Sequence, residues 1–429
     1  MNSENMELML ASGLLGLALV LGAFVAKIAE KFSIPDIPLL LLLGLLVGPI
    51  LGIISPEEAG HIFEYAGPIG LIFILLGGSF TMRISLLRKV LPTIIRLDII
   101  TLIISLIVSG IIFNLVLGLP PTNPAGFLFG AVTCATDPAT LIPVFSKVKI
   151  DPKLAIILEA ESIFNDPLGI VATSVVLGTL GLSHAKNPII DFFVLSGGAI
   201  IAGISLAKIY EKIITHAKFH EYVAPLVIGG GMLLLYLGDY LLPNLTGYGF
   251  SGYMAIAIMA LYLGDALFKR AENEEEYKYI VNFCDNLSLL ARVLIFVFLG
   301  ACISLDMLIK YFVPSLIIAL GSIFLARPIG VFLGLIKSGH SIKELIYFAL
   351  EGPRGVVPAA LGVSTSILIK KNADKLPGFV TKYISANDLA GMILVATFMT
   401  ILLSVILEAS WAGILAKKLF GEYKGKSVH

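Results

Sequence analysis

Long apolar runs separated by short polar segments dominate this chain of 429 residues. A helix that spans the hydrocarbon core of a bilayer needs about 20 mostly apolar residues. Thirteen runs fit this requirement, and no segment between them is long enough for a separate soluble domain. We therefore predict an all-α polytopic membrane protein with thirteen transmembrane helices in one membrane domain, 1–429. The predicted spans are 6–26, 37–54, 66–80, 97–118, 124–146, 154–182, 188–207, 221–242, 249–267, 286–304, 311–336, 344–369 and 388–416.

The composition supports the same class. Charged residues make up 14% of the chain, whereas a soluble domain carries about 25%. Hydrophobic residues make up 57% and the mean hydropathy is +0.96. The formal net charge is zero, so nothing favours a nucleic-acid partner, and membrane lipid is the expected surrounding. The three cysteines are interpreted as small hydrophobic residues, and neither a cofactor nor a cleavable signal is expected.

The basic residues are distributed unevenly between the loops. Of the 30 Lys and Arg residues, 21 fall after odd-numbered spans or at the C-terminus, six fall after even-numbered spans, and three lie within spans. Basic residues accumulate on the cytoplasmic side of a membrane. We therefore expect a multi-pass protein of the cell membrane, with its N-terminus outside and its C-terminus in the cytoplasm.

The fifth and twelfth predicted spans contain helix-breaking residues beside charges. The fifth contains Asp137 followed by Pro138, and the twelfth contains Gly352-Pro353-Arg354-Gly355 preceded by Glu351. Proline removes a backbone N–H and disfavours helix at the residue before it. Unwound backbone in a bilayer must be buried in protein or line a cavity. We predict two interrupted helices that cross at mid-membrane, with Asp137 neutralising converging N-termini and the charges beside the second break compensating it. The alternative is a pair of simple proline kinks.

A weak internal repeat in the sequence also relates the fifth span to the twelfth. Leu71–Gly78 of the third span resembles Leu294–Ala301 of the tenth. A shift of seven spans reverses orientation and pairs the fifth span with the twelfth. Inverted repeats of this kind are typical of secondary transporters.

The sixth predicted span carries a polar face made of Glu161, Ser162, Asn165 and Asp166. Residues four apart on a helix are neighbours, so Ser162 lies beside Asp166. Glu161 lies beside Asn165 for the same reason. A charge at this depth costs about 2.5–3.5 kcal/mol or more, so such a cluster is a functional-site hypothesis. Ser162 and Asp166 offer oxygen ligands for a hard cation.

Glu161 is interpreted differently, as a structural charge. A buried, unpaired carboxylate is expensive, so Glu161 needs a proton or a positive partner. Arg327 is the best candidate, and Arg292 and Arg354 are the two others within predicted spans. We favour this ion pair over a direct role of Glu161 in ion transport.

Asp166 is the predicted transport carboxylate. A buried carboxyl group that titrates near physiological pH holds either a proton or a cation, and the two compete. If the protein moves only when the site is occupied, competition produces obligatory exchange. Asn165 cannot titrate, so exchange would be one monovalent cation for one proton and electrically silent. The alternative is a protonated carboxyl group that holds two helices together.

These motifs resemble those of a known family. Glu161 to Pro167, together with Thr136-Asp137-Pro138 and Gly352 to Gly355, is similar to the type-1 cation/proton antiporters. The archaeal sodium/proton antiporters are the closest branch, and the resemblance covers essentially the whole chain. It implies a homodimer in which a transport bundle, 97–182 and 311–416, moves by an elevator-like step. A dimer-interface panel, 6–80 and 188–304, would remain in place.

The resemblance also implies residue roles. Asp166 would bind both the proton and the ion, which is sodium or lithium. The other ion ligands would be Asp137, Ser162 and Thr136, the last through its carbonyl group. The supporting residues would be Asn165, Glu161 and Arg327. Many relatives carry an acidic residue near the position of Gly77, and its absence here predicts a thinner ion shell or access path.

Rival functions remain at this stage. A potassium/proton or unselective cation exchanger would have the same motifs. An intramembrane aspartyl protease could use Asp137 and Asp166 as a dyad that shares a proton, although we expect no enzyme because Asn165 has no clear catalytic task. A channel would not need a site that titrates. Four further carboxylates, Asp98, Asp239, Asp265 and Asp285, fall near predicted helix ends, where they are expected to reach water.

Overall fold

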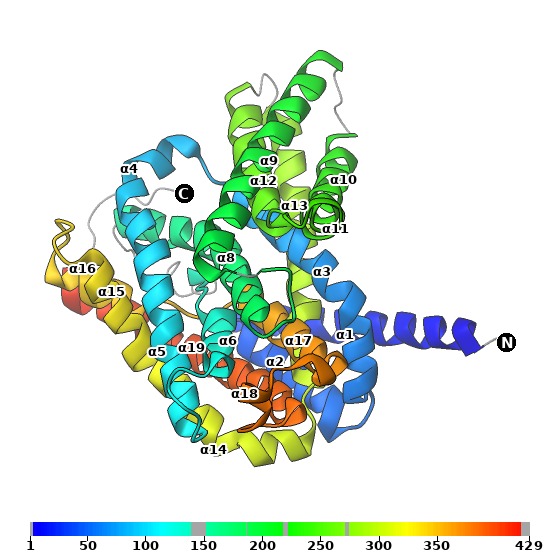
Figure 1. Cartoon of the computed structure of the whole chain (residues 1–429). Helices are drawn as coiled ribbons and strands as arrows, with labels where there is room; N and C mark the ends of the chain where they lie inside the picture. Colours follow the sequence, from blue (N-terminus) through cyan, green and yellow to red (C-terminus); the bar gives the residue numbers. More distant parts are fainter. Residues whose placement is uncertain (1–2, 139–151, 186, 218–221, 271–273, 422–429) are drawn as a thin grey trace.

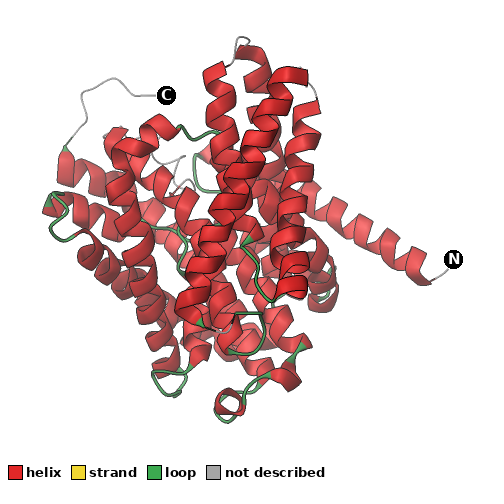
Figure 2. Cartoon of the chain, turned by 45° about the horizontal axis from the view of Figure 1, so that its top comes forward, coloured by secondary structure: helices red, strands yellow, loops and turns green. Residues whose placement is uncertain are grey.

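The structure, a computed structural model, describes residues 3–138, 152–185, 187–217, 222–270 and 274–421. These residues form helices and connecting loops without strands (Figure 2). The helices are α1 (Ser3–Phe32), α2 (Ile37–Leu45), η1 (Leu46–Ile50), α3 (Pro56–Phe80), α4 (Ile84–Ile95), η2 (Arg96–Thr101), α5 (Leu102–Val116), α6 (Pro124–Thr133), α8 (Pro152–Thr179), α9 (Pro188–Ala217), α10 (Val223–Tyr236), η5 (Leu237–Leu241), α11 (Leu242–Thr246), α12 (Gly252–Arg270), α13 (Glu274–Ala301), α14 (Leu305–Gly321), η6 (Ser322–Ala326), α15 (Arg327–Leu335), α16 (Ile342–Leu350), α17 (Val356–Lys371), η7 (Ala373–Lys375), α18 (Gly378–Thr381) and α19 (Ala386–Phe420).

The all-α polytopic membrane fold is confirmed. Nine helical stretches of the described chain are long and apolar enough to cross a membrane. The remaining four predicted spans also contain helices, each with a reason to fall short of that criterion. The second is short, the sixth (α8) carries several charges, and the fifth and twelfth are interrupted. The total of thirteen spans and the inverted repeat stay predictions.

Several helices extend beyond the apolar runs that predicted them. The predicted span 66–80 corresponds to α3, which begins at Pro56. Its start is a capping box, in which the Ser55 hydroxyl accepts the Glu58 N–H at 3.2 Å and the Glu58 carboxylate accepts the Ser55 N–H at 2.8 Å. Such a box satisfies two backbone donors that a helix start leaves unpaired. The first turns of α3 are polar, so a prediction based on apolar runs placed the start of this helix too late.

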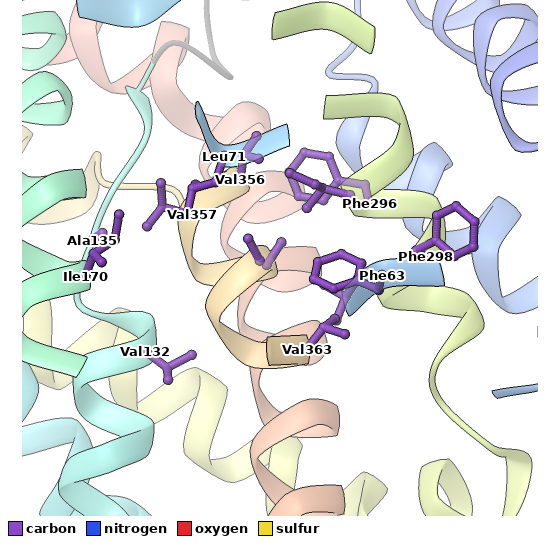
Figure 3. Close-up of a cluster of buried hydrophobic side chains, with 14 of the residues drawn as sticks. Phe63, Leu71, Val132, Ala135, Ile170, Phe296, Phe298, Val356, Val357 and Val363 are labelled. Atoms are coloured by element: carbon purple, nitrogen blue, oxygen red, sulfur yellow. The ribbon is translucent and has the colours of Figure 1, made fainter. Parts of the chain in front are cut away.

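The core lies where α3, α13 and α17 pack together. Figure 3 shows Phe63 of α3 near Val363 of α17, with Phe296 and Phe298 of α13 beside them. All four side chains are at most 1% exposed. This packing holds α17, the second half of the interrupted twelfth span, against α3 and α13. Figure 1 shows α1 extending away from the remaining helices.

The two interrupted spans touch at their breaks. In the fifth, α6 ends at Thr133 and residues 134–137 form no regular secondary structure, while residues 139–146 of that prediction lie outside the described residues. In the twelfth, α16 ends at Leu350 and α17 begins at Val356, so the predicted interruption is confirmed. The Asp137 N–H donates to the Pro353 carbonyl at 2.7 Å. The breaks therefore satisfy part of each other's backbone hydrogen bonding, which a pair of independent kinks would not do.

Candidate ion-binding site

The polar face of α8 faces two different surroundings. Glu161 and Asn165 are fully or almost fully buried, at 0% and 3% exposure. Ser162 and Asp166 are half-buried and line a cavity. The helical spacing seen in the sequence therefore divides the polar face into two stripes. The stripe of Glu161 and Asn165 lies against packed protein, and the stripe of Ser162 and Asp166 lies against the cavity.

Asn165 holds the break of the fifth span. Its side-chain oxygen accepts the Thr136 N–H at 3.1 Å, and its Nδ2 donates to the Thr136 hydroxyl at 2.7 Å. The residue thus acts as donor and acceptor at once, which an ionised aspartate cannot do. The Asn165 amide, which has no clear catalytic task, has a structural one. It accepts the backbone N–H of Thr136, which lies outside any helix and has no helical hydrogen bond.

Glu161 forms a bidentate ion pair with Arg327, one of its three candidate partners. Arg327 Nη2 donates to Glu161 Oε2 at 3.0 Å, and Arg327 Nη1 donates to Glu161 Oε1. Arg292 instead contacts Asp36 at 3.1 Å, and Arg354 Nη1 donates to the Gly352 carbonyl at 2.8 Å. Because both members of the Glu161 pair are buried, each removes the cost of burying the other.

The Arg327 guanidinium also caps the C-terminus of α16. Its Nε donates to the Phe348 carbonyl and its Nη2 to the Glu351 carbonyl, both at 3.2 Å. The last carbonyls of a helix lack partners inside the helix, and a positive charge complements its dipole there. A Cβ at Gly352 would lie 2.6 Å from Arg327 Nε, so glycine is needed for the arginine to lie against this backbone.

Asp137 lies at the N-terminus of α17. Gly355 is the N-cap residue of that helix, and a Cβ on it would overlap the Asp137 side chain. A carboxylate at this position meets the positive end of the helix dipole. The predicted role of Asp137 at converging N-termini is therefore met for α17, while the second half of the fifth span lies outside the described residues.

A cavity of about 420 Å³ lies beside Asp137, Ser162 and Asp166. Asp166 Oδ1 is buried and has no hydrogen-bond partner among the described residues. A buried acceptor of this kind needs a ligand, a proton or water. Thr136, the fourth predicted ligand, is not among the described residues that line the cavity. The other polar residues that line it are Ser79, Thr81, Glu159, Asp285, Ser288 and Arg292.

Gly77 also lines this cavity, and its side-chain position is occupied by a neighbour. A Cβ at Gly77 would overlap the Ser288 hydroxyl of α13, which donates to the Phe73 carbonyl at 2.8 Å. An acidic side chain would not fit here without displacing Ser288. Carboxylates still face the cavity, because Asp285 of α13 and Glu159 of α8 line it.

Four buried carboxyl groups were assigned wrongly or overlooked at the sequence level. Asp265 was expected to reach water, but it is 3% exposed and its carboxylate accepts the Ile84 N–H at 3.0 Å. Asp98 was expected to reach water, but it is 3% exposed and lies in η2, within the continuous helical stretch Ile84–Val116. Glu351 was expected to compensate the second break, but the Gly352 N–H donates instead to Glu408 Oε2 at 2.6 Å. Glu408, at 3% exposure, was missed, although a lone glutamate within an apolar span is a recognisable signal.

The fold and the site together define a multi-pass membrane protein with a carboxylate-lined cavity at the meeting point of two broken helices. The chain belongs to the sodium/hydrogen exchanger family, whose transmembrane model matches residues 17–418.

The comparison with individual proteins extends over the whole chain. It is 71% identical to the Na(+)/H(+) antiporter 1 of Methanocaldococcus jannaschii, over 98% of each chain. It is 48% identical to a probable Na(+)/H(+) antiporter 2 of the same organism, over 96% of this chain and 98% of the relative. A solved structure of the sodium proton antiporter MjNhaP1 from that organism at pH 8 superposes with a TM-score of 0.94, covering 97% of this chain and all of that chain.

Proposed function

We propose that this protein is a sodium/proton antiporter that exchanges one sodium or lithium ion for one proton across the cell membrane. The observation that carries the proposal is the surrounding of Asp166. Its Oδ1 has no partner among the described residues, and it faces a cavity with Ser162 and Asp137. Oxygen donors of this kind suit a hard monovalent cation. The names of the two relatives support sodium and protons as the exchanged ions.

Exchange follows from competition at Asp166. The carboxyl group binds the cation when it is ionised and loses the cation when a proton takes its place. Since Asn165 is locked to Thr136 by two hydrogen bonds and cannot titrate, it adds no second proton. The cycle is therefore one for one and electroneutral.

The remaining predicted residues divide into ligands and supports. Ser162 and Asp137 supply oxygen ligands from the cavity wall, and Thr136 supplies its carbonyl group at the edge of the break. Asn165 fixes that break, and the ion pair of Glu161 fixes the other one. The ligands are thereby held in place before the ion arrives, which lowers the ordering cost of binding.

The cavity lies between the part that we expect to move and the part that we expect to remain in place. Asp137, Ser162, Asp166 and Val356 belong to the proposed bundle, 97–182 and 311–416, whereas Gly77, Asp285 and Ser288 belong to the proposed panel, 6–80 and 188–304. An ion site on one wall of such an interface suits an elevator-like step, in which the bundle carries the site past the panel.

The orientation and the dimer are part of the proposal. Thr81 and Met82 also line the cavity, and they precede the basic segment of Arg83 and α4, which the distribution of charge along the sequence predicts to be cytoplasmic. The cavity is therefore the inner access path, with the N-terminus outside. The homodimer would form through the panel, where α1 carries exposed apolar residues such as Val20 and Phe24, at 55% and 67% exposure.

The test is ion-driven pH change in proteoliposomes that contain the purified protein. An imposed sodium gradient should move protons, and an imposed membrane potential should not alter the rate. A response to potential would refute the one-for-one exchange. Equal proton movement with a potassium gradient would favour the less selective exchanger, and cleavage of a membrane substrate without ion flux would favour the protease.

A further inference from the structure

A second group of buried charges surrounds the break of the twelfth span, apart from the ion cavity. Its six members are at most 4% exposed, and each interacts electrostatically with at least one other member. The group contains two guanidinium groups and four carboxyl groups. They are Arg327, Arg354, Asp98, Glu161, Glu351 and Glu408.

Two of the carboxyl groups are compensated by the arginines or by backbone donors. Glu161 is held by Arg327. Glu408 accepts the Gly352 N–H at 2.6 Å and lies within the electrostatic reach of Arg354.

Glu351 is left over. It is 0% exposed, and neither of its carboxyl oxygens has a hydrogen-bond partner among the described residues. It does not line the ion cavity. Asp98 is in the same situation at 3% exposure, with both oxygens unpartnered.

The groups that face Glu351 give its carboxyl group no hydrogen-bond donor among the described residues, although the charge of Arg327 attracts a carboxylate there. Arg327 donates to the backbone carbonyl of Glu351 and not to its carboxyl group, and its remaining contacts go to Glu161 and Phe348. Glu408, from α19, repels an ionised neighbour. Tyr347, four residues earlier on α16, has a buried and unpartnered hydroxyl group. An ionised carboxylate buried without donors is far more costly than a neutral acid.

We infer that Glu351 is a second proton-binding site, whose proton stays bound throughout the transport cycle. This inference rests on the proposed function for its role in the cycle. A neutral Glu351 adds no negative charge to the break of the twelfth span, so the carboxyl group of Asp166 is the one whose charge alternates. The proton at Glu351 is retained because the residue is 0% exposed and does not line the ion cavity.

The first experiment is infrared spectroscopy of the detergent-solubilised protein with carboxyl-labelled glutamate. A C=O stretching band of a protonated glutamate should be present, should shift with the label, and should persist when the pH and the sodium concentration change across the active range. It should disappear in Glu351→Gln and persist in Glu161→Gln. Loss of the band on raising the pH within that range, or its persistence in Glu351→Gln, would overturn the inference.

The second experiment compares the same two variants in thermal stability and transport. Glutamine resembles a neutral glutamic acid, so Glu351→Gln should keep the melting temperature of the wild type and an exchange rate within about twofold. Glu161→Gln should lose stability, because it strands Arg327. If Glu351→Gln loses as much stability as Glu161→Gln, or fails to fold, Glu351 is ionised and the inference is wrong. The spectroscopic and stability results do not need transport, so they distinguish this failure from failure of the antiport proposal.

Discussion

Glu161 and Asp166 lie on the same helix, little more than one turn apart, in opposite surroundings. Glu161 is sealed from solvent and engaged by both terminal nitrogens of Arg327. Asp166 is half-buried against a cavity and keeps one oxygen unpartnered among the described residues. A charge that maintains structure has its partners built in. A carboxylate with an unpartnered oxygen beside a cavity can accept a ligand, and under the proposed function that ligand is the transported ion.

The largest effect is expected from removing the charge at the incomplete site. Asp166→Asn should abolish sodium-driven proton movement, because the amide neither titrates nor supplies a negative ligand. The fold should be retained, since the side chain contributes no described hydrogen bond through Oδ1. Transport in proteoliposomes and the melting temperature measure the two halves of this prediction. Residual exchange at the wild-type rate would remove Asp166 from the mechanism.

The opposite result is expected for the sealed pair. Glu161→Gln leaves Arg327 buried without its counter-charge, which should lower the free energy of unfolding by about 3–5 kcal/mol. Denaturation followed by circular dichroism would measure it. A double variant, Glu161→Gln with Arg327→Gln, should recover part of the loss. If the single variant is as stable as the wild type, the pair is not the structural element described here.

A smaller effect is expected when one neutral ligand is removed from the cavity. Ser162→Ala takes away a hydroxyl oxygen beside Asp166, worth about 1.4 kcal/mol or a tenfold rise in the sodium concentration for half-maximal rate. The maximal rate and the proton dependence should change little. Ser288→Ala is a suitable control, because Ser288 lines the same cavity but donates to the Phe73 carbonyl. Equal effects of the two substitutions would contradict a direct contact of Ser162 with the ion.

The smallest effect is expected at the cavity wall that belongs to the panel. Asp285→Asn removes a carboxylate that lines the cavity, and so weakens the attraction of cations toward it. The half-maximal sodium concentration should rise about twofold at low ionic strength, and the difference should vanish at high salt, because screening shortens the reach of a charge. A loss that is independent of salt would make Asp285 an ion ligand and place the site across both walls.

Local features of the chain predicted more of this protein than non-local ones. The apolar runs predicted the membrane fold, and the helical repeat at Glu161 to Asp166 predicted two polar stripes. The prolines and glycines of the fifth and twelfth spans predicted breaks, and the second break is confirmed at Leu350 to Val356. Each of these features depends on neighbours within a few residues, because helix period and proline geometry are local properties.

Partner choice could not be settled in the same way. Arg327 pairs with Glu161 across 166 positions, while Arg292 and Arg354 satisfied the same sequence criterion. The Gly352 N–H meets Glu408, 56 positions away, and not the adjacent Glu351. The composition of the cavity near Gly77 was also unpredictable, because Ser288 reaches it from a distant helix.

The sequence by itself therefore determined that the protein spans a membrane, that the twelfth span breaks, and that a polar face with Asp166 lies within an apolar span. The tertiary structure decided which buried charges are compensated and which are left open to the cavity. The physical reason is that a charge within an apolar run can be recognised from its sequence neighbours, and so can the cost of burying it. The compensation of that charge depends on side chains that distant helices bring within hydrogen-bonding distance.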